Sequence, residues 1–172
     1  MTAELTDLTV LSGPGVGSDE FKAVFRRHPA GVAVVALADG GRLVGFTATS
    51  VISVSAAPPS LAFSLATSSS SWPALARART VAISFLAAGQ SDVSARFATS
   101  GIDRFAAGGW VRLPTGEPVI EGAVAWLRGR VVQRTPVGDS HLVAVRALSG
   151  AVASGAPPLV YHDRAYRRLD GP

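Results

Sequence analysis

The chain has 172 residues, of which 48% are apolar and 16% charged, so it is long and apolar enough to form one folded domain with a substantial core. Its formal net charge is +4, and its basic residues are scattered arginines apart from Lys22, with one adjacent pair late in the chain at Arg167–Arg168. This pattern argues against a nucleic-acid partner and fits a small anionic ligand, while the absence of cysteine excludes disulfides and thiolate metal sites.

Residues 1–17 end in S-G-P-G-V-G, a breaker-rich stretch that predicts a flexible N-terminal tail. The folded domain is then expected over residues 18–172. The tail carries Glu4 and Asp7 rather than a basic leader, and no apolar run approaches the length of a membrane span. We therefore expect a cytoplasmic protein without a membrane partner.

Three short helices are predicted. The first begins with Ser18 as its N-cap, carries apolar residues at helical spacing and ends before Pro29. The second starts at Trp72–Pro73, because proline suits the first turn of a helix. The third covers residues 91–98, with Ser91 as its cap.

The rest of the chain is predicted to be mostly β, apart from a long excursion over residues 99–118 that glycine and proline punctuate. D-G-G at 39–41 predicts a hairpin turn, and Pro58–Pro59 ends the preceding strand. The expected strands cover residues 32–37, 44–55, 61–66, 81–86, 119–134, 141–148, 159–162 and a short piece around 166–169. Since no strand–helix alternation is sustained, the expected fold is mainly β, an antiparallel barrel or sandwich with a few short helices.

The stretch G-F-T-A-T-S at 45–50 is small and hydroxyl-rich, although a strand prefers bulky side chains. Gly45 inside a strand marks a bulge or a close backbone approach. One interpretation is an irregular edge strand. The other is a flat ligand lying against exposed backbone, with Thr47, Thr49 and Ser50 donating hydrogen bonds to it.

Four consecutive serines at 68–71 separate an apolar strand from the helix that starts at Trp72. A flexible connector is one explanation. An anion site is the other, because hydroxyls and free backbone N–H groups at a helix start suit a phosphate. Arg96 either neutralises that phosphate or belongs to a solvated helix face.

No nucleophile elbow, phosphate-loop lysine or paired-carboxylate motif occurs, and the single G-x-G at 15–17 does not follow a strand. The three histidines are His28, His141 and His162. They are too few and too dispersed for a metal site, and each is either a general acid–base candidate or a structural residue. No metal is therefore expected.

Nine short motifs occur in a characteristic order and spacing along the chain. They are H-P-A-G-V at 28–32, G-F-T-A-T-S-V-I-S-V-S at 45–55, P-P-S-L-A-F-S-L at 58–65, S-S-S-W-P-A-L at 69–75, S-A-R-F at 94–97, D-R-F-A at 103–106, P-V-I-E-G-A at 118–123, V-G-D at 137–139 and P-L-V-Y at 158–161. Each motif is weak alone, but their order and spacing together are specific. On these motifs the chain from Phe25 through Leu169 resembles the flavin reductase family, which supplies reduced flavin to partner monooxygenases.

The resemblance implies a split β-barrel, which is a Greek-key antiparallel barrel, working as a homodimer with flavin bound near the subunit interface. It implies an NAD(P)H:flavin oxidoreductase that reduces free FMN or FAD with NADH or NADPH and releases it to a partner monooxygenase. Two alternatives keep the same fold. One is a flavoprotein that retains its flavin and acts on a specific small molecule, and the other is a non-catalytic cofactor-binding module.

The resemblance also assigns site residues. Those implied to contact the flavin ring and ribityl chain are Val44, Gly45, Phe46, Thr47, Thr49, Ser50, Ser64, Leu65 and Ala66. Those implied to hold the flavin phosphate are Ser70, Ser71, Arg96 and Phe97. Those implied to receive the nicotinamide nucleotide are Tyr161, His162, Asp163 and Arg164. Under this assignment the serine cluster is a phosphate site, and no protein acid or base is obligatory for hydride transfer.

One departure from the family pattern concerns the residue beside the nicotinamide. Family members commonly have G-D-H after the turn, whereas this chain has Ser140 at the matching position and His141 one residue later. A shift of one residue in a strand reverses the face to which a side chain points. Ser140, His141 and His162 are therefore all candidates for orienting the nicotinamide.

Overall fold

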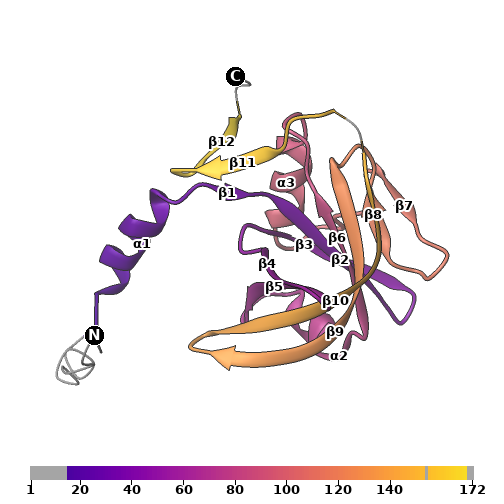
Figure 1. Ribbon diagram of the computed structural model, residues 1–172, viewed down its shortest axis with the longest axis horizontal. Helices are drawn as coiled ribbons and strands as arrows, with labels where there is room; N and C mark the ends of the chain where they lie inside the picture. The colour runs from indigo at the N-terminus through magenta and orange to yellow at the C-terminus, as the bar shows by residue number, and fades with distance from the viewer. Residues whose placement is uncertain (1–14, 154, 170–172) are drawn as a thin grey trace.

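The computed structural model describes residues 15–153 and 155–169, which form a β-rich body from which one N-terminal helix projects (Figure 1). The predicted tail lies outside these residues except for positions 15–17. Of the helices in the described ranges, none combines the length and the apolar character that crossing a bilayer requires.

The three predicted helices are confirmed as α1 (Ser18–Arg26), α2 (Trp72–Arg77) and α3 (Ser91–Ala98). The predicted caps are wrong by one residue, because Gly17 and Gln90 occupy the N-cap positions. Gly17 already has the extended backbone typical of an N-cap. Gln90 is held in place by its side chain, which accepts from the Ala87 N–H at 2.9 Å and donates to the Glu121 carbonyl at 2.7 Å.

The strands form three antiparallel sheets, which confirms the mainly β expectation. Their bounds are β1 (Ala30–Gly31), β2 (Ala33–Asp39), β3 (Arg42–Ala48), β4 (Ile52–Ala56), β5 (Pro59–Ala66), β6 (Thr80–Phe85), β7 (Trp110–Arg112), β8 (Pro118–Ile120), β9 (Ala125–Val137), β10 (Ser140–Val152), β11 (Leu159–His162) and β12 (Ala165–Arg168). The main sheet has the order β3-β2-β6-β9-β10-β5-β4, beside a three-stranded sheet β1-β11-β12 and the hairpin β7-β8. The predicted D-G-G turn joins β2 to β3.

Two predicted strands are each divided in the structure. The stretch 44–55 splits into β3 and β4, which lie at opposite ends of the main sheet's pairing order. In the connection between them, the Ser50 hydroxyl accepts from the Ser64 N–H at 2.9 Å and donates to the Ser64 carbonyl at 3.3 Å. The stretch 119–134 splits into β8 and β9, and Gly122, whose φ is +73°, lies in the turn between them.

The core consists of two clusters of buried side chains. The first is formed mainly by side chains of main-sheet strands, among them Phe63, Ile83 and Val143, together with Leu75 of α2. The second joins elements that are far apart in the sequence. Its buried members are Val32, Val34, Ala36, Leu86, Phe97, Phe105, Ile120, Ala123 and Leu159. This second cluster therefore packs α3, the excursion after it and the start of the β11–β12 hairpin against the same side of β2.

Gly45 of β3 lies directly under two aromatic rings. A Cβ atom built on Gly45 would lie 2.8 Å from Phe97 Cε1, closer than real Cβ contacts come, and 3.0 Å from Phe105 Cζ, which is also unusually tight. The sequence predicted a bulge or a close approach to the backbone at Gly45. The groups that approach it are the Phe97 and Phe105 rings of the same chain. The missing side chain lets α3 and the excursion pack directly on β3.

We predict that Gly45→Ala lowers the free energy of unfolding by about 1–3 kcal/mol, because the added methyl group overpacks this contact. The measurement is urea unfolding followed by circular dichroism. Gly89→Ala is the matched control, since nothing lies within 4 Å of its Cβ position. Equal unfolding midpoints for the two variants would contradict the packing argument.

Glu117 and Arg128 form a buried ion pair under the β7–β8 hairpin. Glu117 is 2% exposed, and its Oε2 accepts from Arg128 Nε at 2.9 Å and from Thr115 Oγ1 at 2.5 Å. Burial alone would raise the pKa of this carboxyl, but the hydrogen bonds, that of Arg128 first, outweigh burial and lower the pKa to about 2. The hairpin is therefore anchored to β9 by a carboxylate that stays ionised.

This anchor predicts a defined pH dependence of stability. Because the folded pKa lies below the ordinary value of 4.5, the stabilisation is fully present above that value and is lost as the pH falls toward 2. We expect Glu117→Gln to cost about 2–3 kcal/mol at pH 7 and progressively less below pH ~4.5. Urea titrations of both proteins across this range measure the difference. A constant difference down to pH ~2 would show that Glu117 does not titrate in this window.

Candidate functional site

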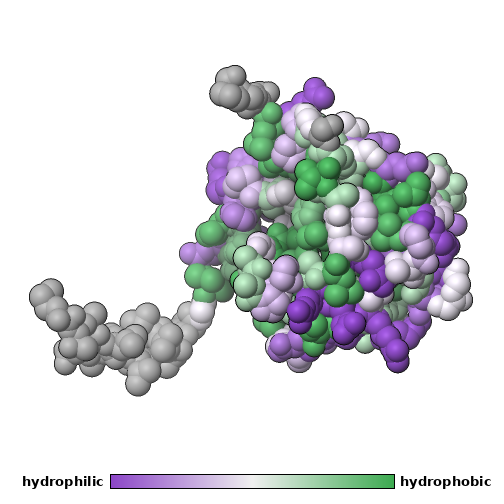
Figure 2. Space-filling model, turned by 45° about the vertical axis from the view of Figure 1, so that its right-hand side comes forward, coloured by the Kyte–Doolittle hydropathy of each residue, from purple (hydrophilic) through white to green (hydrophobic). Residues whose placement is uncertain are grey.

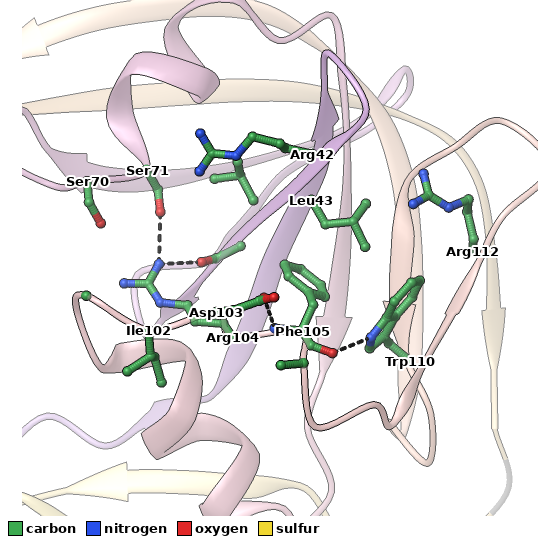
Figure 3. A pocket seen from close by; sticks show the side chains of 14 residues that line it. Arg42, Leu43, Ser70, Ser71, Ile102, Asp103, Arg104, Phe105, Trp110 and Arg112 are labelled. Atoms are coloured by element: carbon green, nitrogen blue, oxygen red, sulfur yellow. Dashed lines mark hydrogen bonds between the residues drawn. The ribbon is translucent and has the colours of Figure 1, made fainter.

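A cavity of about 730 Å³ lies beside β3, within the size range of small-ligand sites (Figure 3). Four segments line it: β3, the serine turn before α2, the excursion after α3, and β7. Its lining residues are Arg42, Leu43, Val44, Gly45, Ser70, Ser71, Gly101, Ile102, Asp103, Arg104, Phe105, Ala106, Trp110 and Arg112. The cavity thus joins segments that the second core cluster and the Gly45 contact hold together.

The charge of the lining favours an anion. The lining contains three arginines, Arg42, Arg104 and Arg112, and one carboxylate, Asp103. Asp103 is also engaged locally, since its Oδ1 accepts from the Phe105 N–H at 3.0 Å. Arginines together with serine hydroxyls are the donors that phosphate groups bind, so this set suits a phosphorylated ligand.

Arg104 connects three parts of the cavity wall. Its Nη1 donates to the Gly45 carbonyl at 2.6 Å and to Ser71 Oγ at 3.0 Å (Figure 3), and its Nε donates to the Thr99 carbonyl at 2.8 Å. Burial lowers the pKa of this guanidinium below its ordinary value, but arginine stays protonated in proteins. Arg104 therefore fixes the serine turn to β3 and supplies a positive charge.

Two aromatic side chains, Phe105 and Trp110, form another part of the cavity wall, and the buried Phe97 packs behind Phe105. The rings of Phe97 and Phe105 meet edge to face at 5.0 Å, and those of Phe105 and Trp110 do so at 5.7 Å. Trp110 Nε1 donates to the Phe105 carbonyl at 3.0 Å, which fixes the indole (Figure 3). The cavity therefore offers an apolar surface for a planar ring as well as an anion site.

Four residues predicted to contact flavin line this cavity: Val44, Gly45, Ser70 and Ser71. The other predicted flavin residues do not line it. Phe46 and Phe97 are buried in the two core clusters.

Four further predicted residues lie around the turn between β3 and β4 and at the end of β5. Thr47 Oγ1 donates to the Ser94 carbonyl at 2.6 Å, and Thr49 is exposed. Ser50 and Ser64 are brought together by their two hydrogen bonds. These residues and Leu65 and Ala66, which follow on β5, lie outside the cavity wall, and their flavin contacts stay a prediction.

Arg96 is held away from the cavity lining. Its Nη2 donates to the Gly108 carbonyl at 3.2 Å, and its Cζ lies 5.5 Å from the centre of the Phe97 ring. Its Nε is buried without a hydrogen-bond partner. The guanidinium beside Ser71 belongs instead to Arg104, a residue to which sequence reasoning gave no role in the site.

His141 contacts residues on both sides of the serine turn at 68–71. Its ring stacks on Trp72 with centroids 3.8 Å apart, and its Nδ1 lies 3.2 Å from Thr67 Oγ1. Ser140, paired with Ala66, donates instead to Asp139 Oδ1 at 2.9 Å. The one-residue shift thus gives the two side chains different surroundings, and their role toward the nicotinamide stays a prediction.

The residues predicted to receive the nicotinamide lie together on the β11–β12 hairpin. Tyr161 and His162 end β11, while Asp163 and Arg164 form the turn with φ of +49° and +61°. The Asp163 N–H donates to the Arg26 carbonyl at 3.2 Å, which ties the turn to the end of α1. The structure therefore groups these four residues on an element separate from the cavity wall.

The lining residues that sequence reasoning did not assign to the site are Arg42, Leu43, Gly101, Ile102, Asp103, Arg104, Phe105, Ala106, Trp110 and Arg112. The signal for Arg104 was present, because D-R-F-A at 103–106 was one of the family motifs. No group of three or more metal-ligating side chains occurs within residues 15–153 and 155–169. The site is therefore built from arginines, hydroxyls and aromatic rings.

Comparisons with known proteins agree with this geometry. Residues 25–170 match the model of the flavin reductase like domain. The chain is 43% identical over 160 residues to an NADH:FMN oxidoreductase of Rhodococcus erythropolis, an alignment that covers 90% of this chain and 83% of the relative. The chain belongs to the flavin reductase like domain family.

Two solved structures show the same fold. The flavin reductase domain protein of Arthrobacter sp. FB24 has a TM-score of 0.86 at 36% identity and covers 90% of this chain and 97% of its own. A homologue of nitrilotriacetate monooxygenase component B from Mycobacterium thermoresistibile has a TM-score of 0.82 at 26% identity, covering 90% and 89%. The similarity thus extends over nearly the whole described domain.

We predict that Arg104, and not Arg96, is the main anion-binding arginine. Arg104→Gln should weaken pyrophosphate binding by about tenfold or more, because a charge-assisted contact is worth roughly 1.5–3 kcal/mol. Arg96→Gln, the matched control on α3, should change the affinity less than about twofold. Isothermal titration calorimetry gives both affinities. A larger loss in the Arg96 variant would return the phosphate to the position that the sequence predicted.

Proposed function

We propose that this protein reduces free flavin with NAD(P)H and supplies the reduced flavin to a partner monooxygenase. Membership of the flavin reductase like domain family over residues 25–170 carries the proposal. The 43% identity to a protein named NADH:FMN oxidoreductase supports the reaction, and the likeness to a monooxygenase component B supports the partner.

The residues of the cavity fit a flavin nucleotide. Arg104, Ser70 and Ser71 supply donors for a phosphate, and Arg42 adds a further positive charge to the lining. The aromatic wall of Phe105 and Trp110 suits the flat, largely apolar ring. The same donors would hold either FMN or the pyrophosphate of FAD.

The chain's own contribution to the reaction is binding and orientation. The hydride chemistry is supplied by the nicotinamide and flavin rings when both are bound, so the protein needs no acid or base for that step. β3 is at one end of the main sheet and pairs only with β2. The main-chain N–H groups on its other side are therefore available to polar atoms of the flavin ring. Arg104 holds the serine turn at a fixed place relative to this strand.

We further propose that the main sheet curves into a split barrel, with β3 and β4 as its edge strands, and that the protein works as a homodimer in the cytoplasm. Nothing on α1 is buried, although Phe21, Val24 and Phe25 lie on one side of it. The helix projects from the body in Figure 1, and Figure 2 shows hydrophobic residues exposed on the face turned to the viewer. An exposed apolar helix face of this kind is expected to be covered by a second subunit.

The direct test is to mix the purified protein with NADH or NADPH and with FMN or FAD. Oxidation of the nicotinamide nucleotide is measured as the loss of its absorbance. We expect oxidation that depends on added flavin and saturates with it, and Arg104→Gln should raise the KM for flavin by about tenfold. No acceleration with any nucleotide and flavin pair would contradict the proposal. Isolation with retained flavin and poor turnover of free flavin would favour a flavoprotein that acts on a specific small molecule.

A further inference from the structure

One buried serine connects the strand predicted to contact flavin with the hairpin predicted to receive the nicotinamide. Ser94 of α3 is fully buried. Its carbonyl accepts from Thr47 Oγ1 of β3 at 2.6 Å, and its Oγ lies 2.9 Å from the hydroxyl of Tyr166 on β12. Three elements far apart in the sequence therefore meet on a single residue.

Tyr166 lies beside the nicotinamide segment, which we define as the four residues Tyr161–Arg164 that are predicted to receive the nicotinamide nucleotide. It is the cross-strand partner of Tyr161, and the two rings meet edge to face at 5.4 Å. The turn residues Asp163 and Arg164 lie between these two tyrosines in the chain. The Tyr166 hydroxyl therefore adds a direct link between the β11–β12 hairpin and α3.

We propose that Tyr166 is a positioning residue that sets the distance between the nicotinamide segment and β3 through Ser94. This inference rests on the proposed function, since it assumes that a nicotinamide nucleotide binds along Tyr161–Arg164. The Tyr166 hydroxyl touches neither nucleotide nor flavin in this account. It acts by holding the hairpin where a bound nicotinamide faces the strand that contacts the flavin.

The geometry distinguishes this role from simple stabilisation of the fold. The Thr47 bond uses the carbonyl of Ser94, and the Tyr166 bond uses its side chain, so one can be removed without the other. Tyr166→Phe removes the hydroxyl but keeps the ring against Tyr161. The variant therefore removes the hairpin's hydrogen bond to α3 and leaves its other contacts, β3, the cavity and the second core cluster in place.

We expect Tyr166→Phe to raise the KM for NADH and the Kd for NAD⁺ about three- to tenfold, because one such hydrogen bond contributes about 0.5–1.5 kcal/mol. The Kd for FMN should change less than about twofold. Ser94→Ala should reproduce this pattern, and the double variant should be no worse than either single variant, since both remove the same bond. Ser91→Ala on the same helix is the control and should match the unmodified protein.

Two results would overturn the proposal. One is an unchanged KM for NADH and Kd for NAD⁺ in Tyr166→Phe. The other is an equal loss of FMN and NAD⁺ affinity, which would indicate general loosening of the domain. The NAD⁺ affinity is measured by calorimetry without turnover, so it tests the hairpin even if the unmodified protein fails to reduce flavin, a failure that would reject the proposed function separately.

Discussion

The bare backbone at Gly45 allows two aromatic rings to contact β3, and the arrangement of the site depends on this contact. Phe97 packs α3 against β3 at Gly45, and Phe105 packs the excursion that follows α3 against the same place. Once Phe105 is fixed, its neighbour Arg104 reaches the Gly45 carbonyl and the Ser71 hydroxyl. A glycine in the middle of a strand loses β-propensity, and here the close packing of two rings offsets that loss.

The same contact explains why charge and aromatic surface occur together in the cavity. Arg104 is adjacent to Phe105 in the chain, so placing one ring in the core directs one guanidinium into the cavity. Trp110 is then fixed by its hydrogen bond to the Phe105 carbonyl. A ligand with a flat ring and a phosphate matches both features, which is why the geometry and the family membership lead to the same function.

The helices and most of the strands could be predicted from the sequence, because helical spacing, D-G-G and the proline pairs are local signals. The division of residues 44–55 could not, since β3 and β4 pair with different strands at the two ends of the sheet order, and only the fold brings Ser50 and Ser64 together. The choice of phosphate arginine also depends on distant partners. Arg96 lies in α3 and Arg104 follows shortly after it. Only the hydrogen bonds of Arg104 to Gly45 and Ser71, which are 59 and 33 positions away in the chain, distinguish the two arginines.

The central claim is that the anionic end of a flavin nucleotide binds between the serine turn and Arg104. The most direct measurement is a crystal structure of the protein with FMN. The account predicts phosphate density within hydrogen-bond distance of Ser70, Ser71 and the Arg104 guanidinium. Phosphate density beside Arg96, with the cavity next to β3 free of ligand, would contradict it.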